Sequence, residues 1–327
     1  MGTMFCKLAN RLLTPLGLVA LKTKRFHQII SERDHFAALY RSRCQQKQLR
    51  KDGLSCITFS RDRAIQLHAL LVSYFDKFSP AAPLQVIFQA TSPGHREAYD
   101  DLRSIFAGRE VTFISQESPT SFRQDLISAL ERIETKKLFF LVDDIIFTGR
   151  IDSRDWAKFD TDRFIPTLRL GLNLKRCYTL QQEQPLPPML SGLISDGDKI
   201  VWDWKEGKAD WGYPLSVDGN LFASAEILAM TRLVSFSAPN SYEEALQEFR
   251  PVFQERRGIA FRKSRIVNVP CNKVQVENRN ICGTLHQDLL LAKWQEGLCI
   301  DVEKLYGIEN TSAHEEIPLS FVKRKIP

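Results

Sequence analysis

Two adjacent carboxylates, Asp143 and Asp144, follow a run of five apolar residues (138–142) and are well placed to do chemistry. A buried strand rarely ends in unpaired charge, because an unpaired buried carboxylate is costly. Hard oxygen ligands at the carboxyl end of a strand suit Mg²⁺ or Mn²⁺, with a diphosphate completing the coordination shell. The same pair would also serve as acids that cap the loop or bind an arginine, such as Arg150 or Arg154.

A second candidate group is the segment SRDR at residues 60–63, which contains Ser60, Arg61 and Arg63 and follows an apolar run. The planar guanidinium fork of arginine matches phosphate oxygens. The alternative is a solvated turn in which Asp62 caps the next helix. The sequence contains neither GxGxxG nor GxxxxGK[ST], which disfavours a dinucleotide-dependent dehydrogenase and a P-loop NTPase.

Aromatic and acidic side chains crowd into residues 202–218. Aromatic faces can stack on the apolar faces of sugars, and interleaved carboxylates can bind hydroxyl groups. Most tryptophans belong to a core, and we expect two of these four aromatic residues to do so. The aromatic residues are Trp202, Trp204, Trp211 and Tyr213, and the acids are Asp203, Asp210 and Asp218.

Strands and helices alternate in the first half of the chain and must position these groups. Predicted strands begin about every 27 to 30 residues, the length of one βα unit, which predicts a parallel, doubly wound sheet. Such sheets bind ligands at the carboxyl ends of their strands, so the loops beginning near Ser60, Thr91 and Asp143 should share one edge. The predicted strands are residues 54–60, 84–91, 111–115 and 137–147, and the predicted helices are 64–75, 93–106 and 118–133.

The second half of the chain is less regular. The pattern SYEE at residues 241–244 is a capping box that predicts the start of a helix. A loose tail is expected to end the chain. Predicted strands are residues 167–172, 199–204 and 267–269, and predicted helices are 221–233, 241–254 and 284–296.

Composition indicates a globular protein, because 43% of the 327 residues are apolar and 26% are charged. The net charge of +6 fits phosphate-bearing ligands, an anionic membrane surface or nucleic acid, and selects none of them. The seven cysteines form no CxxC pair and no zinc-finger spacing, which favours reduced thiols and a cytoplasmic setting.

The N-terminal segment, residues 1–50, is predicted to be a basic, amphipathic helical prefix. Its apolar run at residues 12–21 is interrupted by Pro15 and followed by Lys22, Lys24 and Arg25, which disfavours a signal sequence. The run is also too short for a transmembrane helix, which needs about 20 apolar residues. The prefix would pack on the body of the protein or lie peripherally against the inner face of a membrane.

Four segments together resemble bacterial GT-A-type glycosyltransferases, which use nucleotide-diphospho-sugars. The segment ITFSRDRAIQLHALL (57–71) looks like their opening strand and helix, and FLVDDIIF (140–147) resembles their aspartate motif. The segment YPLSVDGNLF (213–222) is similar to the acceptor-side segment that carries the catalytic residue, and NTSAHEEI (310–317) lies where a late metal-binding histidine often falls. The resemblance spans roughly residues 54–320.

This resemblance implies a GT-A-like α/β fold, with a Rossmann-type, doubly wound, mostly parallel sheet and an irregular acceptor-side half. Residues 54–150 would bind the nucleotide-sugar, residues 151–320 would bind the acceptor and carry catalysis, and residues 321–327 would be the tail. Two departures from the family pattern are VDDI in place of Asp-x-Asp, and QATS at residues 89–92, where an acidic pair usually contacts the base.

The resemblance also assigns roles to individual residues. Asp144 and Asp143 would hold Mn²⁺ or Mg²⁺ with His314, for which His286 is a rival. Asp218 would be the general base, although it could also be a helix N-cap ahead of Leu221. If Asp218 is the base, the reaction is a single displacement that inverts the anomeric centre. If Asp218 is not the base, retention of the anomeric configuration stays open. Ser60, Arg61, Arg63 and Asp143 would contact the donor.

The predicted activity is transfer of a sugar from a nucleotide-diphosphate sugar to a glycan or lipid-linked acceptor, in surface polysaccharide or glycoconjugate synthesis. One alternative is a sugar nucleotidyltransferase, although the Gly-rich loop usual in those enzymes is missing from SRDR. Another is a non-catalytic binding scaffold on the same fold. Nucleic acid is not an expected partner, since no recognised motif accompanies the positive charge.

Overall fold

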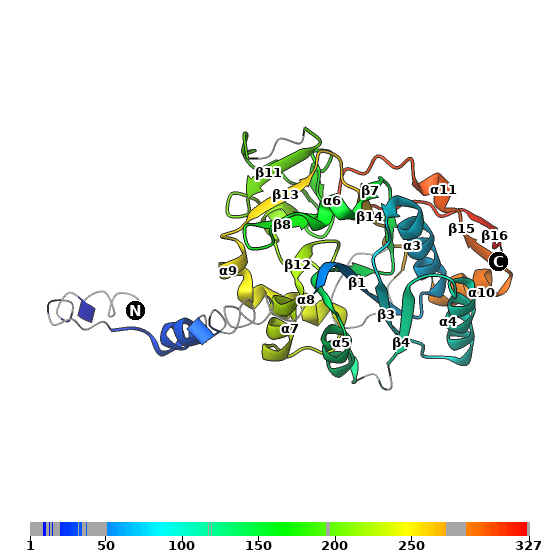
Figure 1. Cartoon of the computed structure of the whole chain (residues 1–327), viewed down its shortest axis with the longest axis horizontal. Coiled ribbons are helices and arrows are strands. Elements are labelled where there is room, and N and C mark those ends of the chain that lie inside the picture. Colours follow the sequence, from blue (N-terminus) through cyan, green and yellow to red (C-terminus); the bar gives the residue numbers. More distant parts are fainter. Residues whose placement is uncertain are drawn as a thin grey trace.

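Five strands form the central sheet, in the order β12-β5-β1-β3-β4 (Figure 1). Strands β5, β1, β3 and β4 run parallel, and β12 pairs antiparallel to β5. In this computed structural model, the residues described are 9–10, 13, 15, 20–31, 33–34, 37, 51–116, 118, 120–193, 197–272 and 286–325. The central strands are β1 (Lys51–Arg61), β3 (Leu84–Gln89), β4 (Val111–Ser115), β5 (Thr135–Val142) and β12 (Leu221–Ala223).

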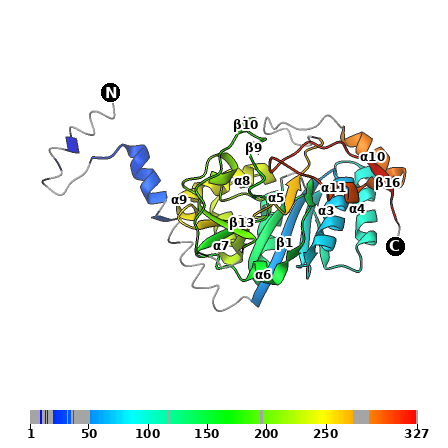
Figure 2. The same cartoon turned by 90° about the horizontal axis from the view of Figure 1, so that it is seen from above.

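Helices cover both faces of this sheet, which is why its strands are apolar on both sides. Side chains of β1 alternate between the two layers: Cys56 joins the core under one face, and Ile57 joins the core under the other. Figure 2 shows the two groups of helices on opposite sides of the strands. One face carries α3 (Ala64–Lys77), α4 (Pro93–Ile105) and α10 (Gln287–Gln295), and the other carries α5 (Phe122–Glu131), α7 (Ser224–Leu233) and α8 (Pro239–Leu246).

The second half of the chain adds small sheets rather than further βα units. A three-stranded sheet has the order β11-β13-β8, and β14 pairs with β6 immediately after the aspartate pair. These strands are β6 (Ile145–Phe147), β8 (Phe164–Thr167), β11 (Lys199–Asp203), β13 (Arg257–Phe261) and β14 (Ile266–Asn268). The remaining elements are β2 (Phe78–Ser79), β7 (Ile151–Asp152), α6 (Ser153–Ala157), β9 (Arg176–Cys177), β10 (Gln182–Glu183), η2 (Ala209–Gly212), η3 (Gln247–Phe249), α9 (Arg250–Phe253), β15 (Leu298–Ile300), α11 (Val302–Leu305) and β16 (Phe321–Lys323).

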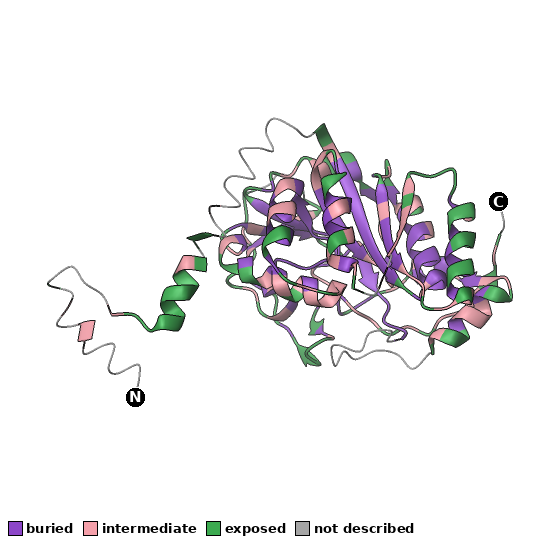
Figure 3. Cartoon of the chain, turned by 90° about the horizontal axis from the view of Figure 1, so that it is seen from below, coloured by how far each residue is buried: buried purple, intermediate pink, exposed green. Residues whose placement is uncertain are grey.

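The predicted α/β class is confirmed: the protein has an α/β fold with a doubly wound, mostly parallel sheet and a less regular second half. Its central strands are buried between the helices, as Figure 3 shows by the purple ribbon at the middle of the molecule. This arrangement brings the carboxyl ends of β1, β3 and β5 to one edge of the sheet.

Several predicted boundaries are wrong in the second half. The first three residues of the helix predicted at 221–233 form β12, because they pair with β5. Helix α8 begins at Pro239 rather than at Ser241, whose hydroxyl instead accepts the N–H of Ala238 at 3.0 Å. The strand predicted at 167–172 lies at Phe164–Thr167. In the predicted tail, Phe321–Lys323 pairs with β15.

Within the predicted N-terminal prefix, residues 23–31 are helical and the side chains of residues 21–29 are exposed. The rest of the prefix lies largely outside the described residues. None of the helices in the described ranges is both long and apolar enough to cross a membrane.

Candidate functional site

A cavity of about 770 Å³ opens at the carboxyl ends of the central strands. Its wall combines the ends of β1, β3 and β5 with the loop before β12, the first turns of α8 and the segment around residue 314. The structure therefore brings together the seven residues to which the family resemblance assigns catalytic, donor-binding or metal-binding roles. They are Ser60, Arg61, Arg63, Asp143, Asp144, Asp218 and His314.

The aspartate pair lies in the turn between β5 and β6 and is held by groups from the end of β1. Asp143 accepts hydrogen bonds from the Ser60 hydroxyl at 2.9 Å and from Arg63 Nη1 at 3.0 Å. The same Nη1 lies 3.4 Å from Asp144 Oδ2. The arginine paired with the two acids is therefore Arg63, and not Arg150 or Arg154 as the alternative interpretation expected.

Negative charge is in excess around this pair. Burial raises the pKa of Asp144 to about 7; Arg63 lowers it in part, and the neighbouring carboxylates Asp143 and Asp218 raise it further. Burial also raises the pKa of Asp143, and Arg63 and Ser60 oppose that rise. One guanidinium thus faces several carboxylates, an arrangement that a bound cation would stabilise.

Asp218 reaches the cavity from a turn whose backbone favours a glycine at the next position. Gly219 has φ of +72°, and a Cβ there would lie 2.5 Å from the Ile266 side chain. Its N–H bonds the carbonyl of Phe140 in β5, and its carbonyl accepts the N–H of Leu168. Asp218 is consequently fixed beside the aspartate pair and is not the N-cap of a helix, because β12 follows it.

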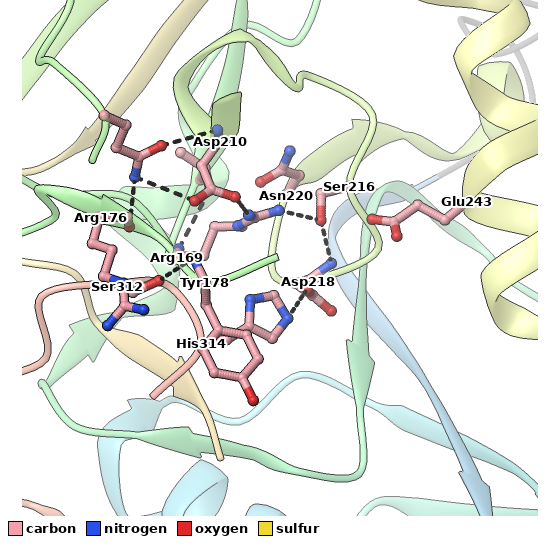
Figure 4. A network of polar contacts seen from close by, with 12 residues as sticks. Arg169, Arg176, Tyr178, Asp210, Ser216, Asp218, Asn220, Glu243, Ser312 and His314 are labelled. Atoms are coloured by element: carbon pink, nitrogen blue, oxygen red, sulfur yellow. Dashed lines mark hydrogen bonds and ion pairs between the residues drawn. The ribbon is translucent and has the colours of Figure 1, made fainter. Parts of the chain in front are cut away.

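His314 comes to the same place through β14. Asn268 pairs with Ile145 after the aspartate turn on one side and forms a bridge to His314 on the other. The imidazole Nε2 lies 3.7 Å from Asp218 Oδ2 (Figure 4). The rival candidate His286 lies elsewhere, as the N-cap of α10, where its side chain accepts the N–H of Asp288.

Two groups in the cavity were missed by sequence reasoning, Arg169 and Glu243. Arg169 donates to the Ser216 hydroxyl at 2.7 Å and forms a buried ion pair with Asp210. Glu243, from α8, points toward Ser216 in Figure 4 and accepts the N–H of Val217 at 3.1 Å. Burial raises the pKa of Glu243 to about 7, and the nearby Asp218 raises it further against the effect of Arg169.

The aromatic cluster is more deeply buried than predicted. Trp202, Trp204 and Trp211 are all core residues, so three of the four aromatic side chains are buried and not two. Tyr213 lines the cavity. Asp62 does not cap α3; its carboxylate accepts both the N–H and the hydroxyl of Thr91 at 2.8 Å, which ties the loops after β1 and β3 together.

The oxygen-rich donor set at Asp144 fits a hard divalent cation. Asp143 is already bonded to Ser60 and Arg63, whereas the contacts of Asp144 with Arg63 and with Asn268 Nδ2 are long, at 3.4 and 3.5 Å. Within the described ranges, no three His, Cys, Asp or Glu side chains are grouped as metal ligands. A cation at Asp144 would therefore need further oxygens, which a diphosphate supplies.

Comparison with known proteins relates the chain distantly to a glycosyltransferase. No protein-family model matches the chain. It is 23% identical over 197 residues to the bifunctional glycosyltransferase pgtA of Dictyostelium discoideum, a match that covers 54% of this chain and 25% of that protein. The chain thus spans a quarter of the length of this curated relative.

Solved structures that are similar to the chain at low identity include the following two. The crystal structure of S. aureus TarS 1-349 matches with 14% identity and a TM-score of 0.42, over 64% of this chain and 57% of that chain. The 4-diphosphocytidyl-2C-methyl-D-erythritol synthase of Anaerococcus prevotii matches with 9% identity and a TM-score of 0.37, over 75% of this chain and 96% of that chain.

Proposed function

We propose that the protein is a glycosyltransferase that moves a sugar from a nucleotide-diphosphate sugar to an acceptor hydroxyl, in the synthesis of a surface polysaccharide or glycoconjugate. The observation that carries this proposal is the convergence of the Asp143–Asp144 turn, Asp218 and His314 in one cavity at the strand ends. The distant relationship to a glycosyltransferase supports it.

The donor would lie against the ends of β1 and β5. Arg61 is exposed at the cavity wall, where its guanidinium would bind phosphate oxygens. Arg63 is already paired with the aspartates. It would therefore act on the donor in two ways, by positioning the aspartates and by its own positive charge. Ser60 and Asp143 complete this wall and hold Arg63 in place.

Asp144 would hold Mn²⁺ or Mg²⁺, with Asp143 next to it and His314 as a further ligand. When bound, the cation would act as a Lewis acid that neutralises charge developing on the leaving diphosphate. The residues fit this function because Asp144 belongs to a buried group of carboxylates whose negative charge Arg63 only partly offsets.

Asp218 would take the proton from the acceptor hydroxyl while that oxygen attacks the anomeric carbon. The bond between the anomeric carbon and the phosphate oxygen breaks, and the nucleoside diphosphate leaves with the electron pair. The imidazole of His314, 3.7 Å away, would keep the Asp218 carboxylate oriented. With Asp218 as base, this is a single displacement that inverts the anomeric centre.

Peripheral membrane contact is a further part of the proposal, with the protein on the cytoplasmic side. Leu21, Phe26 and Ile29 are 45%, 52% and 38% exposed on a segment that also carries Lys22 and Lys24. Apolar and basic side chains together favour binding to anionic lipid. Flotation with anionic liposomes should recover the wild type and not Phe26→Glu; equal recovery of both would contradict this contact.

The donor site is tested by thermal unfolding with a panel of nucleoside diphosphates, with and without Mn²⁺. A ligand that binds the native state raises its melting temperature by mass action. We expect one nucleotide to raise it only when Mn²⁺ is present, and Asp144→Asn to abolish that rise. Absence of a rise with every nucleotide would contradict the donor site and favour a binding scaffold.

A further inference from the structure

Glu243 is a cavity carboxyl group that the reaction described above does not use. It extends from α8 and accepts the N–H of Val217, one residue before Asp218. None of the Lys, Arg and His residues that the structure describes forms an ion pair with Glu243. Its neighbour in the cavity, Asp218, is also an acid. Two carboxyl groups therefore face the same side of the cavity.

The positive charge on this side is already used. Arg169 binds the Asp210 carboxylate and the Ser216 hydroxyl. The Arg169 side chain is 5% exposed, and its Nε, which has no acceptor within the described part of the chain, is itself buried. Arg61 and Arg63 lie at the other side, at the end of β1. The cavity thus carries Arg61 and Arg63 at the end of β1 and an acidic wall formed by Asp218 and Glu243, whose neighbouring arginine, Arg169, is engaged by Asp210.

An acidic wall of this kind selects ligands by charge. A phosphate or carboxylate placed beside Asp218 and Glu243 would face like charges at close range, which weakens its binding. Hydroxyl groups instead donate hydrogen bonds to carboxyl oxygens and satisfy them. If Asp218 takes the proton of the attacking hydroxyl, Glu243 remains to bind a second hydroxyl of the same molecule.

We propose that the acceptor is an uncharged molecule with several hydroxyl groups, such as a neutral sugar, and that Glu243 binds one of them beside the attacking hydroxyl. This proposal rests on the glycosyl transfer proposed above. A second hydroxyl bound by Glu243 would orient the acceptor toward Asp218. Anionic acceptors, such as sugar phosphates and lipid phosphates, would be excluded.

The test measures acceptor binding rather than turnover. Saturation-transfer NMR would compare a neutral methyl glycoside panel with the corresponding sugar 6-phosphates, at saturating Mg²⁺, which is diamagnetic, and the nucleoside diphosphate that raises the melting temperature. We expect at least one neutral glycoside to bind the wild type, with its phosphate at least tenfold weaker. Glu243→Ala should weaken the glycoside at least tenfold, and Glu243→Gln should narrow the gap between glycoside and phosphate.

Glu248→Gln is the matched control, because Glu248 follows on η3, is exposed and lies outside the cavity wall. It should leave both ligands unchanged. The proposal is overturned if the phosphates bind as well as the glycosides, if no neutral glycoside binds, or if Glu243→Ala binds like the wild type. Failure of the glycosyl-transfer proposal would be seen in a different measurement, because no nucleoside diphosphate would then raise the melting temperature.

Discussion

Removal of Arg63 should destabilise the protein strongly, because it strips the aspartate pair of its counter-ion. The side chains of Arg63 and Asp143 are 13% and 4% exposed, so solvent screens their contact little. Breaking a buried ion pair by removing one partner costs about 3–5 kcal/mol. We therefore expect Arg63→Met to lower the free energy of unfolding by about this amount at pH 8, measured by urea titration with tryptophan fluorescence.

The pH dependence of this loss follows from the pKa directions. Burial raises the folded-state pKa of both aspartates above their unfolded values, so each group costs stability as pH rises through its folded pKa. Arg63 opposes that rise, so the gap between Arg63→Met and the wild type should be widest at pH 8 and narrow toward pH 5. Arg61→Met, two residues away and exposed, should stay within about 0.5 kcal/mol of the wild type. A variant at Arg63 that is as stable as the one at Arg61 would refute the counter-ion role.

Three further substitutions test buried groups of the fold. Burial lowers the pKa of His68 to about 4 from 6.5, so protonation of His68 contributes a loss of about 2 kcal/mol between pH 7 and pH 5, and the stability of the wild type should fall by about this amount relative to His68→Phe in urea titrations; a constant difference between the two proteins would contradict this. Gly219→Ala should lower the melting temperature and the affinity for acceptor together, because of its φ of +72° and the contact with Ile266; wild-type values for both would contradict a fixed Asp218 turn. Glu226→Gln should cost about 3–5 kcal/mol, since it leaves a buried guanidinium unpaired; a loss under 1 kcal/mol would show that the pair is dispensable.

The parallel sheet could be predicted from the sequence because its signal is local. The apolar runs at residues 54–60, 84–91 and 111–115 lie on β1, β3 and β4 within a few residues. The prediction failed in the second half of the chain, where strand pairing and not the local sequence pattern decides the structure. Residues 221–223 continue smoothly into an apolar helix, and only the edge of β5 makes them a strand.

The same distinction between local pattern and tertiary pairing applies to the residues of the candidate site. The rule that ligands bind at the carboxyl ends of parallel strands placed Ser60 and Asp143 together correctly. Asp218 and His314 were found through the family resemblance, since 96 residues separate them and their contact depends on β14. Glu243 was missed because it belongs to the SYEE pattern, where acids are normally solvated, and nothing local shows that α8 turns it toward Asp218.

The central claim is most directly tested by incubating the protein with a panel of nucleotide-sugars, Mn²⁺ and neutral glycosides, and analysing the products by mass spectrometry. The account predicts release of one nucleoside diphosphate together with a glycoside one sugar heavier, and a loss of both by at least 100-fold in Asp218→Asn. Intact nucleotide-sugars throughout, or formation of a nucleotide-sugar from a sugar 1-phosphate and a nucleoside triphosphate in a parallel reaction, would contradict glycosyl transfer.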